Sequence, residues 1–391
     1  MPVINRIAEF HADMTAWRHD LHQHPELALK ETRTSGVVQQ LLHDFGVDEV
    51  HAGLAGTGVV GVIRGAHPGS AAIGLRADMD ALPIHEETGT AWASQTPGVM
   101  HACGHDGHTS MLLGAAKYLA ETRNFAGTVY VIFQPAEENF GGGRMMVDEG
   151  LFEQFPMQQV YGMHNWPSVP AGTFKWRDGP IMAAVANIDI TVTGRGAHGA
   201  QPHMGVDPIV VSAAIVQALQ SIVSRNVEPA RAGVVTIGSI QGGHIFNVIP
   251  ETVRMLGTAR WFDPEVGDLL EAGVIRVATH VAQGFGATAD VRFSREYPAT
   301  VNDPAAMALA RHAAESVSGP ARVEHMALPT MGGEDFSFML NAKQGAYIML
   351  GAGRGPDDAM VHHPKYDFND DILPVGASYW ATLAEQLLPR G

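Results

Sequence analysis

Short apolar segments alternate with helical segments along most of this chain, and this alternation constrains the fold more than any other feature. The apolar segments cover residues 58–64, 71–76, 128–133, 159–163 and 346–351. Patterns typical of helices cover residues 1–24, 31–45 and 109–120. Buried apolar strands that alternate with helices are typical of an α/β domain. We therefore predict an α/β fold with a mixed, mostly parallel sheet.

The middle of the chain, residues 185–297, has a different pattern. Its predicted elements follow the order β-α-β-β-α-β, with helices across 207–224 and 264–284. This order resembles a ferredoxin-like α+β unit, which commonly forms a separate domain. Because α/β elements resume after it, we predict that 185–297 is inserted into a domain built from residues 1–184 and 298–391. A length of 391 residues also favours two domains.

Composition excludes several classes of partner. The chain has 41 acidic and 25 basic residues, a formal net charge of −16, which opposes binding to nucleic acid or anionic membranes. No segment approaches the roughly 20 unbroken apolar residues that span a bilayer, and the N-terminus lacks a signal peptide's basic start and apolar core. One cysteine cannot form an internal disulfide, so we expect a cytoplasmic protein.

The single cysteine lies in the most informative segment of the sequence, M-H-A-C-G-H-D-G-H-T at residues 100–109. Cys103 stands two positions before His105, and Asp106 and His108 follow. Thiolate and imidazole are good ligands for a borderline-soft divalent metal. A lone cysteine is more often buried filler, but the histidine-rich surroundings favour a metal ligand.

Further acids and histidines follow the predicted strands. They are Asp78 and Asp80 after the second strand, Glu137 and Glu138 after the third, His164 after the fourth, and His362 and His363 after the fifth. In open α/β sheets, sites form at the carboxyl ends of the strands. One edge of the sheet is therefore expected to gather a thiolate, imidazoles and carboxylates. This mixture suits a pair of divalent ions that polarise a carbonyl and activate water.

The adjacent acids Glu137 and Glu138 suit a division of roles. One carboxylate would be a metal ligand, and its neighbour would accept the proton of the attacking water. Two acids after a strand are more commonly a solvated loop pair. The three other clusters favour the catalytic interpretation.

The roles of the remaining polar residues are not decided by the residues alone. Asp80 and Asp106 suit acceptors that orient a ligand imidazole, with surface or capping roles as the alternative. Asp78 suits either a ligand or a supporting role. The residues alone do not decide whether His362 or His363 points inward.

Several motifs occur together in order along the chain. They are W-R-H-D-L-H-Q-H-P-E-L, R-A-D-M-D-A-L-P, M-H-A-C-G-H-D-G-H, F-Q-P-A-E-E, G-A-H-G-A-Q-P-H-M-G-V-D-P-I, N-V-I-P, M-G-G-E-D-F-S and H-H-P-K-Y-D-F-N-D. With them the chain resembles the aminoacylase and hippurate-hydrolase branch of the co-catalytic metallopeptidases, which includes indole-acetyl-amino-acid hydrolases. The resemblance runs from about Trp17 to Ile372.

This resemblance implies a metallopeptidase-type catalytic domain with two divalent metal ions, for which zinc, manganese, nickel and cobalt are candidates. The implied ligands are Cys103, His105, Glu138, His164 and His362, the last because the ligand histidine in this branch stands two residues before proline. Glu137 would be the general base and later the acid that protonates the leaving amine. More distant relatives have a His-x-Asp pair where this chain has Asp78 and Asp80, so Asp78 is not assigned as a ligand.

The resemblance also implies that the inserted segment is a lid and dimerisation domain. His198 would stabilise the oxyanion in the partner subunit's site, and Asn247 and Arg260 would bind the amide or carboxylate of the substrate. Gly332 and Gly333 would allow close backbone approach to a carboxylate, although they equally suit a tight turn. The implied assembly is a homodimer, with a tetramer as the alternative.

The predicted activity is metal-dependent hydrolysis of an N-acyl amino acid to a carboxylate and a free amino acid. The acyl group would be of the N-acetyl, N-benzoyl or indole-acetyl type. Alternative activities on the same scaffold are deacetylation of an N-acetyl-diamino acid of the diaminopimelate type and dipeptide hydrolysis. A metal-binding protein without catalysis would lack a ligand or the base, whereas this chain has Glu137 beside Glu138.

Overall fold

The computed structural model describes residues 3–390, which form two compact units. The first unit comprises the chain up to Ile181, Thr300–Pro329 and the chain from Glu334 onward. The second unit comprises Met182–Ala299 together with the short segment Thr330–Gly333. The inserted segment expected from the sequence was 185–297. The sequence pattern did not indicate that residues 330–333 belong with the second unit.

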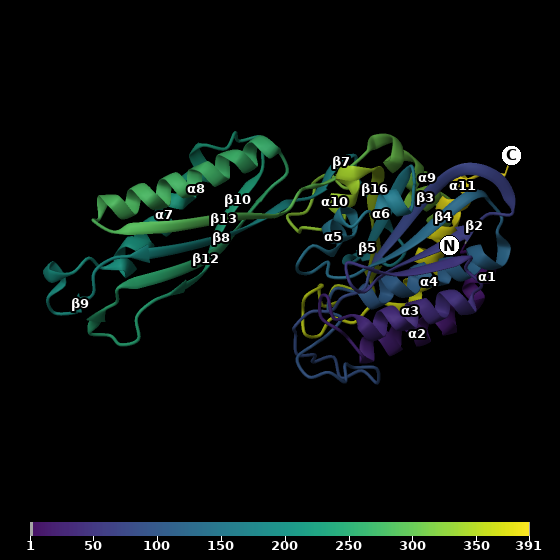
Figure 1. Cartoon of the computed structure of the whole chain (residues 1–391), viewed down its shortest axis with the longest axis horizontal. Helices are drawn as coiled ribbons and strands as arrows, with labels where there is room; N and C mark the ends of the chain where they lie inside the picture. Colours follow the sequence, from purple (N-terminus) through teal and green to yellow (C-terminus); the bar gives the residue numbers. More distant parts are fainter. Residues whose placement is uncertain (1–2, 391) are drawn as a thin grey trace. The chain divides into compact units, whose positions relative to one another are not determined.

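The first unit contains a mixed sheet of eight strands, seen at the right of Figure 1. The strands are β1 (Glu49–Leu54), β2 (Gly58–Arg64), β3 (His67–Asp78), β4 (Ala126–Gln134), β5 (Gln159–Pro170), β6 (Phe174–Trp176), β15 (Val323–His325) and β16 (Gln344–Gly353). Their order is β1-β2-β4-β3-β5-β16-β6-β15. The central neighbours β4, β3, β5 and β16 run parallel, as do β6 and β15. The predicted mixed, mostly parallel sheet is confirmed.

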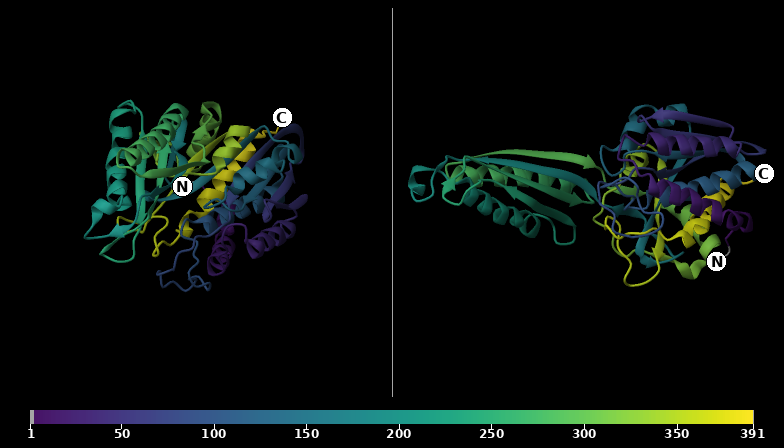
Figure 2. Two further views of the ribbon diagram at one scale, coloured as in Figure 1. Left: turned by 60° about the vertical axis from the view of Figure 1, so that its left-hand side comes forward. Right: turned by 90° about the horizontal axis from the view of Figure 1, so that it is seen from below.

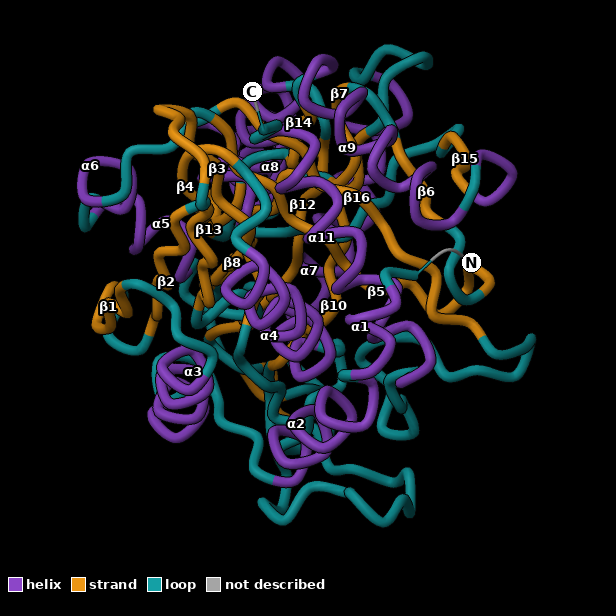
Figure 3. The backbone as a smooth tube through the Cα atoms, turned by 90° about the vertical axis from the view of Figure 1, so that its right-hand side faces the viewer, coloured by secondary structure: helices purple, strands orange, loops and turns teal. Residues whose placement is uncertain are grey.

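Helices cover this sheet and complete its core. They include α1 (Asn5–Glu9), α2 (His11–Gln23), α3 (Thr32–Asp44), α4 (His105–Thr122), α9 (Pro304–Ser318) and α11 (Leu373–Leu387). Figure 3 shows α2, α3 and α4 gathered along one side of the strands. The single N-terminal helix expected from the apolar spacing is interrupted at Phe10. α4 starts earlier than the expected residue 109, which places His105 and Asp106 in its first turn.

The second unit has its own sheet and core. Its main elements are β8 (Ala184–Thr193), α7 (Pro208–Arg225), β10 (Gly233–Gln241), β12 (Thr252–Trp261), α8 (Pro264–Gly284) and β13 (Thr288–Tyr297). The sheet is antiparallel in the order β10-β12-β8-β13, and α7 and α8 lie along one of its faces (Figure 2). This is the β-α-β-β-α-β order predicted from the sequence.

Helix α7 is long and apolar enough to cross a membrane by length and composition alone. Within the second unit, however, Val211, Ile215 and Leu219 of α7 are buried in the core against the sheet. The core helix of a folded domain meets the same criterion, so this helix is weak evidence for a membrane span. No other helix of residues 3–390 meets it.

Packing around α4 predicts a strong effect of a small substitution. A Cβ atom at Gly107 would lie 2.2 Å from the ring of buried Phe368. We expect Gly107→Ala to lower the free energy of unfolding by about 1–3 kcal/mol, because overpacking forces the ring to move. Urea unfolding followed by circular dichroism measures this loss.

A matched control exists in α3. Gly36 is exposed, and a Cβ atom at this position would have no neighbouring atom within 4 Å. Gly36→Ala should therefore stabilise the protein by about 0.5–1 kcal/mol, because alanine is the better helix former. Equal stability of the two variants would contradict the packing described for α4.

Candidate metal centre

The predicted metal ligands lie close together within the first unit. They come from α4, from β5 and from the segments that follow β3, β4 and β16. The residues are Cys103 just before α4, His105 in its first turn, Glu138 after β4, His164 in β5 and His362 after β16. The sequence placed His164 after a strand that ends at residue 163. In the structure β5 continues to Pro170, so His164 projects from inside a strand, where it pairs with Met349 of β16.

The ligand atoms form two groups of three that share one sulfur atom. Cys103, His105 and His164 form one group, and Cys103, Glu138 and His362 form the other, with all atoms of a group within 4.8 Å of one another. Cys103 Sγ lies 3.3 Å from His164 Nε2. Glu138 Oε1 lies 3.2 Å from His362 Nε2 and 4.0 Å from His105 Nε2. This arrangement can hold two ions that share the Cys103 thiolate.

Hydrogen bonds orient two of the imidazoles toward this shared space. His164 Nδ1 donates to the carbonyl oxygen of Asn165 at 2.6 Å, which leaves Nε2 facing Cys103. His105 Nδ1 donates to the Asp80 carbonyl at 2.9 Å and lies 3.2 Å from Asp80 Oδ1. His105 Nε2 is buried and has no hydrogen-bond partner among the described residues. A buried ring nitrogen without a partner is typical of a metal ligand when a carboxylate orients the ring through its other nitrogen.

The centre has an excess of negative charge. Burial raises the pKa of the Cys103 thiol well above its usual value, and Glu138 and Glu137 raise it further. Burial lowers the pKa of His105, but Asp78 and Asp80 outweigh this effect and raise the pKa to about 10. A site that combines thiolate, carboxylate and imidazole donors with an excess of negative charge suits divalent cations.

The adjacent acids Glu137 and Glu138 differ in environment. Burial raises the pKa of Glu137 well above its usual value, and the carboxylates of Glu334 and Glu138 add to that effect. For Glu138 burial acts in the same direction, but His362 and His105 outweigh it and lower the pKa. Neighbouring carboxyls with opposite pKa shifts are typical of a division between acid–base and ligand roles.

A strained turn presents these two acids. Ala136 has a φ of 56° and Phe140 a φ of 73°, both in the left-handed region that costs energy for residues with a side chain. The buried carboxylate of Glu31 holds the turn by accepting a hydrogen bond from the Ala136 N–H at 2.9 Å. Glu31 could not be identified from the sequence, because a single acid at the start of a distant helix gives no local signal of this contact.

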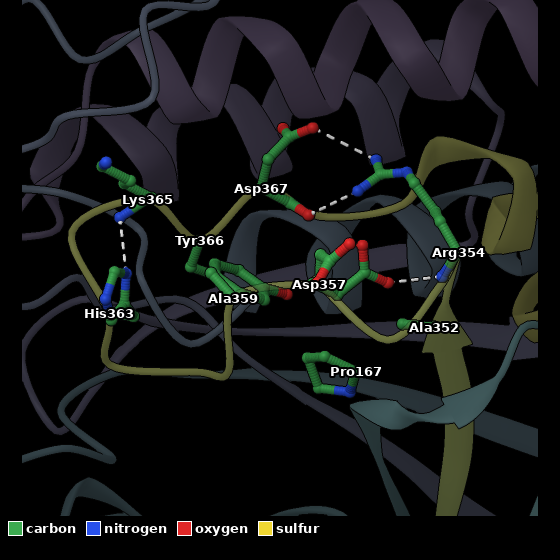
Figure 4. A pocket seen from close by; sticks show the side chains of 10 residues that line it. Pro167, Ala352, Arg354, Asp357, Ala359, His363, Lys365, Tyr366 and Asp367 are labelled. Atoms are coloured by element: carbon green, nitrogen blue, oxygen red, sulfur yellow. Dashed lines mark hydrogen bonds and ion pairs between the residues drawn. The ribbon is translucent and has the colours of Figure 1, made fainter.

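The structure separates the two histidines that the residues alone left undecided. His362 has a φ of 65°, and its N–H donates to the Ala102 carbonyl at 2.7 Å, next to Cys103. His363 points elsewhere: its Nδ1 accepts from the Lys365 N–H at 3.1 Å. His363 lines a separate pocket of about 360 Å³ (Figure 4). The preference for His362 agrees with this geometry.

Two acids have partners other than those expected. Asp106 was predicted to orient a ligand imidazole, but its carboxylate accepts from His22 Nδ1 at 2.8 Å and lies 3.8 Å from Arg18 Nη1. Successive residues of a helix point about 100° apart, so Asp106 faces α2 while its neighbour His105 faces the ligands. Asp78, left open by the sequence, binds Arg76 and His108.

The remaining predicted residues belong to the second unit. His198 in β9 (Ala197–His198) pairs with Val248 of β11 (Val248–Ile249), and the Asn247 carbonyl accepts from the Gly199 N–H at 2.7 Å. His198 and Asn247 are therefore close neighbours, and both are exposed.

Arg260 lies elsewhere in the second unit, near the end of β12, where it pairs with Val185. Its Nη1 lies 3.3 Å from the position of a Cβ atom built on Gly333. Arg260 and the Gly332–Gly333 segment thus form a second cluster. At about 3.3 Å per residue along β12, this cluster is about 26 Å from the strand end that adjoins His198.

Comparison with known proteins agrees with this architecture. Residues 74–386 match Peptidase family M20/M25/M40. The chain is 40% identical to hippurate hydrolase from Campylobacter jejuni, over 99% of this chain and 100% of the relative. It is 36% identical to N-acetylcysteine deacetylase from Bacillus subtilis, over 96% of this chain and 97% of the relative. The solved YXEP protein from Bacillus subtilis, described as a dinuclear metal binding peptidase from the M20 family, matches with a TM-score of 0.82 and 33% identity, over 98% of this chain and 100% of that one.

Fold and site together define a hydrolase that uses divalent metal ions. The chain belongs to Peptidase family M20/M25/M40, and the resemblance inferred from its motifs is confirmed. Arg76, Asn165, Glu334 and Asp335 were not identified from the sequence, and His108 was noted beside Cys103 without a role of its own; all five lie behind the ligands and the base. Most of them stand inside the quoted motifs, but only the folded chain shows what they contact.

The buried pair of His22 and Asp106 generates a pH-dependent prediction. Burial lowers the pKa of His22, but Asp106 outweighs it and raises the pKa to about 9, above the value of about 6.5 in an unfolded chain. The stabilisation is therefore fully present below about pH 6.5 and is lost as the pH rises through about 9.

His22→Gln keeps a hydrogen-bond donor for Asp106 but removes the titrating charge. We expect the variant to be less stable than the wild type by on the order of 2 kcal/mol at pH 6.5, and this difference to shrink by pH 9.5. Urea unfolding of both proteins at the two pH values measures it. A difference that does not change with pH would contradict a charged His22.

Proposed function

We propose that this protein hydrolyses the amide bond of N-acyl amino acids and releases a carboxylate and a free amino acid. The observation that carries the proposal is the pair of ligand groups that share Cys103 beside the buried carboxyl of Glu137. Family membership supports a metal-dependent amidohydrolase. The two relatives named above are called a hippurate hydrolase and an N-acetylcysteine deacetylase, and both names denote hydrolysis of an N-acyl amino acid.

The proposed metal ligands are Cys103, His105, Glu138, His164 and His362. Divalent ions bound there would polarise the amide carbonyl and lower the pKa of water to about 7. The thiolate favours zinc, while the imidazoles and the carboxylate also suit manganese, cobalt and nickel. Asp80 supports two of these residues, because it binds His105 Nδ1 and accepts from the Glu138 N–H at 3.0 Å.

Glu137 is the proposed general base and acid. Its carboxylate takes a proton from the attacking water and later gives it to the departing nitrogen of the amide. A carboxyl whose pKa is raised by burial and by neighbouring acids holds that proton more readily than an ordinary glutamate. The Asp335 N–H, which lies 3.4 Å from Glu137 Oε1, helps to fix the carboxyl in place.

Arg260 and the Gly332–Gly333 backbone are proposed to bind the substrate's carboxylate. No carboxylate of residues 3–390 lies within ion-pair distance of Arg260, and burial lowers the pKa of its guanidinium. Thr258 Oγ1 accepts a hydrogen bond from Arg260 Nε at 3.1 Å. A half-buried guanidinium without a carboxylate partner suits bidentate binding of an anion.

His198 is proposed to stabilise the oxyanion. Its Nδ1 accepts from the Ala200 N–H at 3.1 Å, which places the proton of a neutral ring on Nε2, as an oxyanion donor requires. His198 in β9 is next to the start of β12, and Arg260 lies near the other end of β12, so one substrate can contact both only if a second chain supplies one of them. This supports a homodimer with Asn247 beside His198 at the shared site.

Released amino acid is the measurement that tests this proposal. Purified protein is incubated with N-acetyl, N-benzoyl and indole-acetyl amino acids, N-acetyl-diaminopimelate and a dipeptide, before and after chelation and metal addition. We expect metal-dependent release that is fastest with a simple N-acyl amino acid. A preference for the diamino acid or the dipeptide would favour those alternatives, and no release by metal-loaded protein would overturn the proposal.

Substitution of Glu137 separates the base from the ligands. Glu137→Gln should lower kcat by at least about 10²-fold, because the side-chain amide of glutamine cannot take a proton from water. The metal content per chain should stay unchanged. Elemental analysis and the release assay measure the two properties. Cys103→Ser is the matched control, and its main effect should be a lower metal content per chain. Near wild-type turnover of Glu137→Gln would exclude the assigned base.

A further inference from the structure

Arg76 lies near the end of β3 with its side chain fully buried in the first unit. Nη1 donates to Asp78 Oδ2 at 2.7 Å, and Nη2 lies 3.0 Å from both Glu334 Oε1 and Asp335 Oδ1. Nε donates to Gln134 Oε1 at 2.8 Å. One guanidinium therefore binds three buried carboxylates from two distant parts of the chain.

One branch of contacts leads from Arg76 to Glu137. Arg76 binds the side chain of Asp335, and the backbone N–H of Asp335 lies 3.4 Å from Glu137 Oε1. The Asp335 carboxylate also accepts from the Gly143 N–H at 2.7 Å and from Gln134 Nε2 at 2.8 Å. Because donors converge on this carboxylate from three sides, the Asp335 N–H that faces Glu137 has a fixed position.

A second branch leads from Arg76 to His164. Asp78, which binds Arg76 through Oδ2, contacts His108 Nδ1 through Oδ1 at 2.6 Å. His108 Nε2 lies 2.6 Å from Asn165 Oδ1 and accepts from the Asn165 N–H at 3.0 Å. The Asn165 carbonyl in turn receives the hydrogen bond from His164 Nδ1. Every residue of this branch is buried.

We propose that Arg76 is a positioning residue that holds both the general base Glu137 and the metal ligand His164 through these two branches. It acts through Asp335 on the base and through Asp78 and His108 on the ligand. The inference rests on the proposed function, which assigns those two roles. A purely structural arginine would neutralise the same carboxylates, but the effects of its partners would not divide between catalysis and metal binding.

Two variants separate the branches. Asp335→Asn places an amide N–H among the donors of Arg76, Gln134 and Gly143, so the backbone at 335 must shift. We expect kcat at saturating metal to fall about 10²-fold, as for a small displacement of a reacting group, with unchanged metal affinity. His108→Phe removes both ring nitrogens at similar size and should weaken metal affinity about 10–100-fold, with unchanged kcat at saturating metal.

Arg76 itself should affect both properties. Arg76→Met is expected to lower kcat and metal affinity together, and Arg76→Lys to recover part of each, because lysine keeps the charge but loses the fork of donors. Arg177→Met is the matched control. Arg177 donates to the carbonyls of Pro180, Met326 and Ala327 in the same unit, so its loss should lower stability and leave both properties unchanged.

The experiment combines Co²⁺ titration of metal-free protein, thermal unfolding, and kcat and KM for the N-acyl amino acid that wild type cleaves best. Wild-type protein that binds cobalt but releases no amino acid overturns the proposed function itself. With active wild type, unchanged kcat and affinity in Arg76→Met overturn the positioning role. Equal loss of both properties in Asp335→Asn and His108→Phe also overturns it. If Arg76→Met does not fold, Arg76→Lys and the two branch variants decide.

Discussion

Several carboxylates are buried together at one edge of the sheet, and much of the surrounding structure serves to stabilise their charge. Asp78, Asp80, Glu137, Glu334 and Asp335 are all buried at or behind the ligand groups. Carboxylates cannot remain together in a low-dielectric interior without protons, cations or convergent donors. The chain supplies Arg76 behind the centre and backbone N–H groups around it, and the ligand atoms in front remain for metal cations.

The same constraint explains why segments far apart in the sequence are tied to one another here. Glu31 from an N-terminal helix holds the turn that precedes Glu137. The loop after β16 is joined to the segment before α4 by the bond from His362 to Ala102. These contacts hold backbone in the left-handed region at Ala136 and His362. Strain of this kind persists only where surrounding structure over-determines the conformation, as it does around this centre.

The second unit is organised around an ordinary hydrophobic core. Its alternating strands and two amphipathic helices close a separate hydrophobic core. This unit holds the two small clusters proposed to act on the substrate, His198 with Asn247 next to the start of β12 and Arg260 with Gly333 near its other end. A rigid strand keeps these clusters apart, and that separation is the physical support for a second chain in the proposed reaction.

Local patterns in the sequence predict the α/β class, the β-α-β-β-α-β order of the inserted segment and the positions of the ligand candidates. Strand periodicity and the apolar runs are local signals, and residues that follow parallel strands must share one edge of the sheet. Other features are seen only in the folded chain: His362 and not His363 faces Glu138, Asp106 turns to His22, and Arg76 joins Asp78 to Asp335. These are side-chain directions and pairings that depend on backbone dihedrals and on neighbours distant in the sequence, which local patterns do not encode.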